Sequence, residues 1–207
     1  MKENDKLKLY ENLVDSYGFS EERSVLLKSI YSDLTADVKN LYVLYSIIKN
    51  DREIAWYGGD VVINPAKDSL EISYHSSQAE FAKEEVKGLV AHTITIIEGI
   101  LPQGTLVELD LEKIKVPNPT STQLYVVITK RFIGEETGPF YQYGGDLYPT
   151  GNFGTGKTLF FTPAAIKRVV HMGYESEIEN QFVYEMLDGL VVDEHRLSMG
   201  FVPQKGA

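Results

Sequence analysis

The sequence predicts an α+β fold. A helical N-terminal segment with a small sheet and a long helix precedes a mainly β C-terminal domain with a closing helix. Apolar residues first recur at helical intervals, and from about residue 53 they gather in short runs separated by glycine and proline turn signals. Helical and strand patterns do not alternate regularly, which argues against a parallel α/β sheet.

Helices are expected over most of the first 50 residues. Residues 4–17 carry apolar side chains at helical spacing and are followed by Gly18, a natural stop. Ser20 is placed to cap a second helix. Residues 37–50 are ambiguous, because their apolar spacing is helical but their β-branched and aromatic content also suits a strand. We favour a helix there.

A small sheet followed by a long helix is expected next. Short β-type runs occupy 53–57, 60–63 and 69–75. Ser77 and Glu80 fit the S-x-x-E capping box, which predicts a helix over 78–98. Glycine and proline follow it, so residue 100 is the best candidate for a domain boundary.

The second half reads mainly as strands. β-type runs occupy 105–114, 121–133, 139–149 and 157–161. Thr162 and Pro163 predict one helical turn that runs into a short strand. The last expected helix is 175–187, with Ile178, Phe182, Met186 and Leu187 facing inward, and an extended tail follows over 191–207.

Composition excludes several classes of protein. The 207 residues carry a net charge of −10, which argues against binding nucleic acid or an anionic membrane. There is no cysteine, so disulfides and thiolate metal sites are excluded. None of the four histidines lies within four residues of another, and we expect no metal site and no cofactor. The polar N-terminus and the short apolar runs predict a cytoplasmic protein.

One stretch matches a motif for nucleotide binding. Residues 151–158, "GNFGTGKT", fit the phosphate-loop pattern G-x-x-x-x-G-K-[ST], in which Lys157 would reach the phosphates and Thr158 would hold Mg²⁺. A phosphate loop follows a buried strand and opens a helix. The preceding "YGGDLYPT" does not read as such a strand, and Pro163 would interrupt the helix. We therefore expect a glycine-rich turn, no nucleotide site and no catalytic residue, with a nucleotide hydrolase as the weakest alternative.

The aromatic residues of 139–153 suggest a different role. Five of them fall among glycines and prolines, a composition common in binding surfaces. The alternative is that the rings alternate into the core of a hairpin. The candidate protein-interface residues are Tyr141, Tyr143, Tyr148, Phe153 and Lys157.

Three segments together carry a family resemblance. "LPQGTLVEL" (101–109), "GGDLYPTGNFG" (144–154) and "LFFTPAAIKRVVHMGYESEIENQF" (159–182) resemble the domain-of-unknown-function family 4176 in order and spacing. That family is found in type VIIb secretion loci of Gram-positive bacteria, beside LXG-type toxins and small helical WXG-like proteins. This chain departs from the family's pattern by carrying G-T-G-K-T after the Y-P-x-G turn.

The resemblance implies a cytoplasmic accessory protein that is not an enzyme. It would act as a chaperone or scaffold for an LXG-type effector and its WXG-like partners before export. An immunity protein for a neighbouring toxin is the alternative. The implied domains are a partner-specific region over 1–99, the family-like domain over 100–190, and a tail over 191–207.

Overall fold

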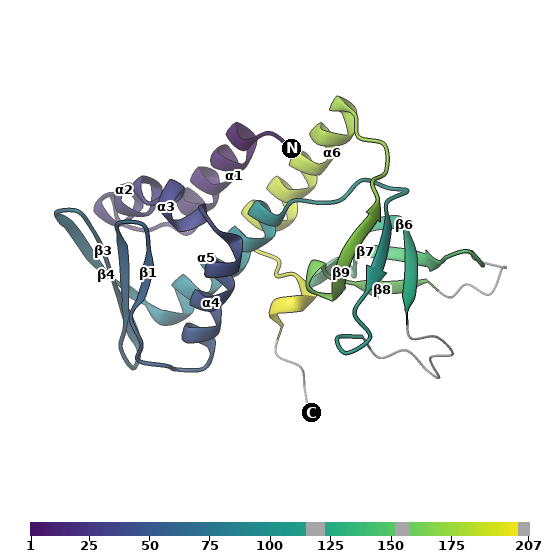
Figure 1. Ribbon diagram of the computed structural model, residues 1–207. Coiled ribbons are helices and arrows are strands. Elements are labelled where there is room, and N and C mark those ends of the chain that lie inside the picture. Colours follow the sequence, from purple (N-terminus) through teal and green to yellow (C-terminus); the bar gives the residue numbers. More distant parts are fainter. Residues whose placement is uncertain (115–122, 152–157, 203–207) are drawn as a thin grey trace. The chain divides into compact units, whose positions relative to one another are not determined.

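The chain forms two compact units. A computed structural model describes residues 1–114, 123–151 and 158–202 (Figure 1). One unit comprises Met1–Gly99 together with Leu187–His195, and the other comprises Ile100–Met186 together with Arg196–Ala207. Helices and two antiparallel sheets share the chain, so the predicted α+β class is confirmed.

Four helices open the first unit. Residues 37–50 are helical, as favoured from the sequence, and Asp37 caps this helix by accepting the Lys39 N–H at 2.9 Å. The stripe of Leu41, Leu44 and Ile48 is fully buried, so the helical spacing outweighs the β-type composition. The helices are α1 (Glu3–Ser16), α2 (Glu21–Ser29), α3 (Tyr31–Thr35) and α4 (Val38–Lys49).

The first unit also contains a four-stranded antiparallel meander. Its strands lie in chain order, and inward residues such as Val61, Ile63, Leu70 and Ile72 alternate with more exposed ones. The strands are β1 (Trp56–Gly58), β2 (Val61–Pro65), β3 (Ser69–Tyr74) and β4 (Ser77–Ala82).

The capping box predicted at Ser77 is wrong. Residues Ser77–Ala82 pair with β3 along their whole length, across a tight turn in which His75 takes a positive φ of 51°. The long helix, α5 (Lys83–Glu98), begins six residues later than Ser77. There the Ala82 N–H donates to a carboxylate oxygen of Glu85 at 3.3 Å. A complete strand pairing therefore outweighs the local signal.

α5 is buried on almost every side. Its N-terminal half contributes Val86, Leu89 and Val90 to the core. Its C-terminal half adds more buried residues, and the threonines among them return their hydroxyls to the helix backbone, from Thr93 to Leu89 at 2.7 Å and from Thr95 to Ala91 at 3.0 Å. Such bonds satisfy polar groups that have left water.

The second unit is built on a five-stranded antiparallel sheet in the order β8-β7-β6-β5-β9. Its strands are β5 (Leu106–Leu109), β6 (Leu124–Gly134), β7 (Phe140–Leu147), β8 (Leu159–Phe161) and β9 (Ile166–His171). Its buried core cluster consists of Val107, Leu109, Val126, Ile128, Tyr143, Phe161 and Ala165.

Two consecutive glycines lie inside β7 rather than in a turn. A Cβ on Gly145 would collide with the Val127 carbonyl of β6, and Gly144 lies opposite an irregularity in that strand's register. Close approach of the two backbones explains the pair. The β-type run predicted over 139–149 is thus confirmed as β7; the view that "YGGDLYPT" does not form a buried strand is wrong only for Tyr143–Gly145, which are buried.

The predicted turn and strand after Phe161 are present. A 3-10 turn, η1 (Pro163–Ala165), leads into β9, and the closing helix α6 (Glu177–Leu187) follows. Among the described residues, no helix is both long and apolar enough to cross a membrane.

The extended tail expected over 191–207 is not observed for its described part. A π-helical segment, η2 (Asp188–Asp193), buries Val191 and Val192 in the first unit. A 3-10 turn, η3 (Met199–Phe201), buries Phe201 in the second unit. Burial of these apolar side chains explains why the segment forms regular structure although its local sequence gives no clear signal for it.

Candidate protein-interaction surface

Gly151 and Thr158, the first and last residues of the stretch that fits the phosphate-loop pattern, lie between β7 and β8. β7 ends at Leu147, and Thr158 leads directly into β8. The Thr158 hydroxyl donates to Asp146 at 3.4 Å. A phosphate loop places its Lys-Ser/Thr pair at the start of a helix, whose backbone N–H groups bind the anion. A strand in that place does not provide this geometry. Lys157 itself lies outside the described residues.

The predicted aromatic interface divides into core and surface residues. Tyr143 is buried; its ring packs 5.4 Å from that of Phe161, and its hydroxyl accepts the Leu101 N–H at 3.0 Å. Tyr143 is therefore a core residue, and its assignment to an interface is corrected. Tyr141 is half-buried against Phe160, and Tyr148 is exposed. Phe153, like Lys157, lies outside the described residues.

The two most exposed large apolar side chains of the second unit lie on α6 and just before it. They are Tyr174, which is 84% exposed, and Ile178, which is 83% exposed, and Phe182 on the same helix is 44% exposed; we call these three residues the α6 stripe. The sequence predicted Ile178 and Phe182 to face inward. Leu187 is buried as predicted, and Val183, which was not predicted, is buried with it. At about 100° per residue, these two lie on the opposite side of the helix from Ile178 and Phe182.

An ion pair fixes α6 to the sheet of its unit. Arg131 of β6 lies 2.8 Å from the Glu179 carboxylate, with the two side chains only 8% and 15% exposed. The Gln103 N–H donates to the same carboxylate oxygen at 3.4 Å. The Arg131 nitrogen in this pair lacks hydrogen-bond geometry, so the contact is mainly electrostatic.

The Phe182 ring contacts two side chains of β6. The Arg131 guanidinium lies over its ring at 5.3 Å from the centroid, and the Phe132 ring meets it edge-on at 6.1 Å. Cation–π and edge-to-face contacts of this kind hold an aromatic ring in place. One face of the Phe182 side chain is therefore positioned while another stays in solvent.

Acidic side chains lie beside the stripe along the chain. Residues 172–186 include Glu175, Glu177, Glu179 and Glu185 but no lysine or arginine. Glu179 is paired with Arg131, and Glu177 and Glu185 are exposed on the same helix as Ile178 and Phe182. The Gln181 amide donates to Glu185 at 2.9 Å. The result is an apolar surface with a negatively charged border.

A second ion-pair cluster lies on the edge strand β9. Lys167 and Arg168 donate to the two carboxylate oxygens of Glu108 at 2.9 and 2.7 Å. These hydrogen bonds hold the pKa of Glu108 below its ordinary value. The Lys167 and Arg168 side chains are themselves more than half exposed, so solvent screens the cluster.

Two histidines distant in sequence meet in the first unit. His92 of α5 shares a hydrogen bond of 3.0 Å with the Tyr17 hydroxyl, and the His195 ring stacks on Tyr17 at 4.7 Å. His195 Nε2 in turn lies 2.7 Å from the Ser16 hydroxyl. The sequence showed no link between these residues, because 103 positions separate the two histidines (195 − 92).

The environment of His92 favours its neutral form. The side chain is 3% exposed, and its Nε2 has no hydrogen-bond partner of good geometry. Burial, followed by the charge of His195, lowers the pKa of His92 to about 4, against a smaller opposing effect of the His195 backbone. The described residues contain no group of three or more His, Asp or Glu side chains placed to hold a metal.

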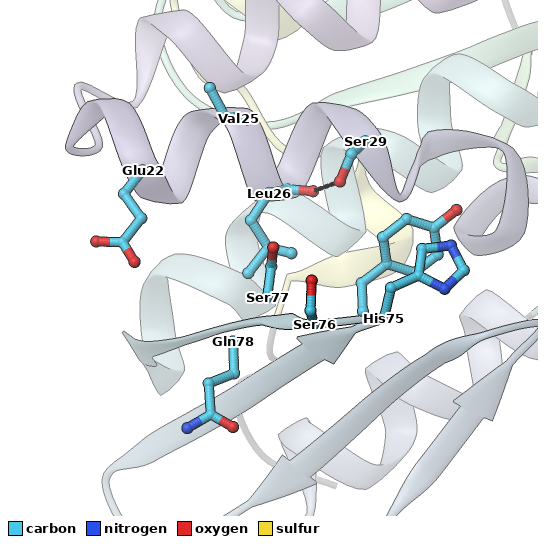
Figure 2. A pocket seen from close by; sticks show the side chains of 9 residues that line it. Glu22, Val25, Leu26, Ser29, His75, Ser76, Ser77 and Gln78 are labelled. Atoms are coloured by element: carbon cyan, nitrogen blue, oxygen red, sulfur yellow. Dashed lines mark hydrogen bonds between the residues drawn. The ribbon is translucent and has the colours of Figure 1, made fainter.

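A pocket of about 730 Å³ opens between α2 and the β3–β4 turn of the first unit. Figure 2 shows Leu26 of the helix pointing towards Ser77 of β4, whereas Val25 points away from the strands. The Ser29 hydroxyl donates to the Leu26 carbonyl at 2.7 Å, which leaves it less available to a ligand. None of the pocket's residues was predicted as functional.

A comparison with known families finds a match within the second unit. Residues 100–182 match the model of DUF4176, a domain of unknown function. The resemblance predicted from the sequence is thereby confirmed for that part of the chain. The match covers β5 to β9 and extends into α6 as far as Phe182, so the α6 stripe lies within the DUF4176 segment. No curated protein and no solved structure shows significant similarity to the chain.

Proposed function

We propose that this chain is a cytoplasmic accessory protein that binds an LXG-type type VII secretion effector, together with small WXG-like helical proteins, before export. In this proposal it acts as a chaperone or scaffold, without catalysis and without a nucleic-acid or membrane partner. The observation that carries it is the α6 stripe, three exposed apolar side chains within the DUF4176 segment. Exposed apolar surface with a polar border is typical of protein-binding sites.

The anchoring of α6 supports the same conclusion. Arg131 and Glu179 form their ion pair with little exposure, so the helix is fixed while its apolar residues face solvent. A fixed apolar surface loses little conformational entropy on binding, which favours affinity. A need for solubility does not explain why Ile178 and Phe182 are both exposed on one side of a helix.

The test is co-expression of the full chain with an LXG effector encoded beside it. The effector is supplied as two tagged pieces, the N-terminal helical domain and the toxic C-terminal domain. We expect the helical domain to co-elute with the chain and the toxic domain not to. Co-elution with the toxic domain alone would favour an immunity protein, and co-elution with neither would remove the proposal.

Two variants locate the binding site in the same experiment. Ile178→Asp places a charge in the stripe and should abolish co-elution. The matched variant Val43→Asp introduces the same charge at a half-exposed apolar position on α4 of the first unit and should leave co-elution unchanged. Equal effects of the two variants would show that the stripe is not the contact surface.

A further inference from the structure

We infer that the α6 stripe receives one amphipathic helix of a partner protein, and that lysine or arginine side chains border the apolar face of that helix. The inference rests on the proposed function and specifies the chemistry of its partner. It is argued from the spacing of the stripe, the charge of its border and the support beneath Phe182.

The spacing of the stripe suits a helix. Ile178 and Phe182 are four positions apart on α6, so they form a ridge about 6 Å long on one side of the helix. Tyr174 extends the apolar surface into the segment before α6. Ridges of residues four apart pack between the corresponding ridges of a second helix. A partner helix would contribute apolar residues at i, i+3 or i+4, and i+7.

The charge of the border selects the partner. Glu177 and Glu185 are exposed on the same helix as Ile178 and Phe182, and the whole chain carries a net charge of −10. A second copy of the chain would place glutamates against glutamates, and an anionic membrane would be repelled. Basic side chains on the partner would instead form pairs with this border and accelerate association.

The surface is prepared for binding before the partner arrives. Arg131 and Phe132 hold the Phe182 ring, and Glu179 holds the helix through Arg131. Arg131 is largely enclosed by these contacts, so it does not neutralise the exposed border. The apolar stripe and its negative border are thus presented together on one fixed element.

The experiment uses two synthetic peptides of about 20 residues, long enough to form a helix. They share one apolar stripe and differ only in its flanking residues, which are lysine in one and glutamate in the other. Fluorescence anisotropy with the full chain measures both. We expect the lysine peptide to bind roughly tenfold more tightly or better than the glutamate peptide. Ile178→Ser with Phe182→Ser should weaken that binding roughly tenfold.

The decisive variant is Glu177→Lys with Glu185→Lys, which should reverse the preference between the peptides. Val43→Ser, the control on α4, should change nothing. Circular dichroism verifies that each variant is folded. Equal binding of the peptides, no saturable binding, or a lysine preference that survives the charge reversal would overturn the inference, because attraction would then arise elsewhere.

The outcome is separable from that of the proposed function. A chain that retains the effector's helical domain but shows no charge preference at α6 supports the function and refutes this partner chemistry. A chain that binds the lysine peptide through the stripe but no effector domain supports the partner chemistry and refutes the secretion role.

Discussion

The helices α5 and α6, which follow α1 to α4 in the chain, differ in how much of their apolar surface is buried. α5 has ten buried residues, and its apolar side chains complete the core of the first unit. α6 buries Val183 and Leu187 but leaves Ile178 and Phe182 in solvent. The first unit therefore uses its helix for stability, whereas the second unit keeps part of its helix available for contact.

The largest expected effect on stability concerns α5, the more fully buried of the two helices. Ile94→Ala removes a fully buried side chain of α5 and should lower the free energy of unfolding by about 2–5 kcal/mol. Urea denaturation followed by the fluorescence of Trp56, the single tryptophan and a buried residue of the same unit, measures it. Ile178→Ala on α6, followed by amide hydrogen exchange along that helix because Trp56 reports on the other unit, should change the stability of its unit by less than about 0.5 kcal/mol. Similar losses would mean that the two helices are not used differently.

Two titratable groups on α5, the buried His92 and the partly buried Glu98, should have opposite effects on stability as the pH changes. The pKa of His92 is lowered to about 4, so its stabilising neutral state is lost as pH falls from 6.5 towards 4. Burial raises the pKa of Glu98 to about 7, although the Tyr42 hydroxyl donates to it at 2.9 Å. Glu98 therefore costs stability as pH rises from 4.5 towards 7.

Each shift corresponds to about 3 kcal/mol at most, because one pKa unit is worth about 1.4 kcal/mol. Glu98→Gln should expose the loss of stability in acid that His92 causes, and His92→Gln should expose the loss at neutral pH that Glu98 causes. Denaturation midpoints between pH 4 and 7 measure both. Parallel profiles for the two variants and the parent would contradict the assignment.

The ion pair that anchors α6 should have an intermediate effect. Glu179→Gln removes the charge that faces the enclosed Arg131 guanidinium and should cost about 1–3 kcal/mol. Amide hydrogen exchange along α6 reports the loss, while Trp56 in the other unit should not respond. Glu177→Gln, at an exposed position of the same helix, is the matched control. Unchanged exchange in Glu179→Gln would show that α6 is held by packing alone.

The smallest expected effects belong to the stripe itself. Phe182→Leu removes the contacts with Arg131 and Phe132 and should cost about 0.5–1 kcal/mol of stability. Tyr174→Leu, at the most exposed position, should cost less than that. Thermal denaturation compares the two. A larger loss for Tyr174→Leu would indicate that the stripe already serves the unit's own packing.

Sequence periodicity predicted most elements because it records local geometry. The ambiguous segment that became α4 and the turn into β9 were both identified from side-chain spacing and capping residues. The signal at Ser77 failed because β4 is determined by its pairing with β3, which a local motif does not record. The glycines of β7 misled for the same reason, since their role is the close approach of β6.

The interaction surface was harder to predict than the fold. Residues 175–187 carry apolar side chains on two sides, and only the tertiary structure shows that Val183, rather than Ile178, is covered. Tyr143 could not be told from Tyr141 by alternation, because Gln142 to Gly145 of β7 are all buried. The opposite charges of Arg131 and Glu179 were visible, but nothing in the sequence linked positions 48 residues apart (179 − 131).

Because Leu187–His195 belongs to the first unit, that unit cannot be completed until nearly the whole chain has been synthesised. A ribosome releases residues 1–99 while Val191, Val192 and His195 are still untranslated, so α1 and α5 emerge without the segment that packs beside them. Residues 100–186 of the second unit are thus synthesised between the two segments of the first, and the rest of the second unit, from Arg196, follows them. Its strands must leave the exit tunnel before the first unit can close, and a fragment that stops at Gly99 would keep Tyr17 and His92 without their last neighbour.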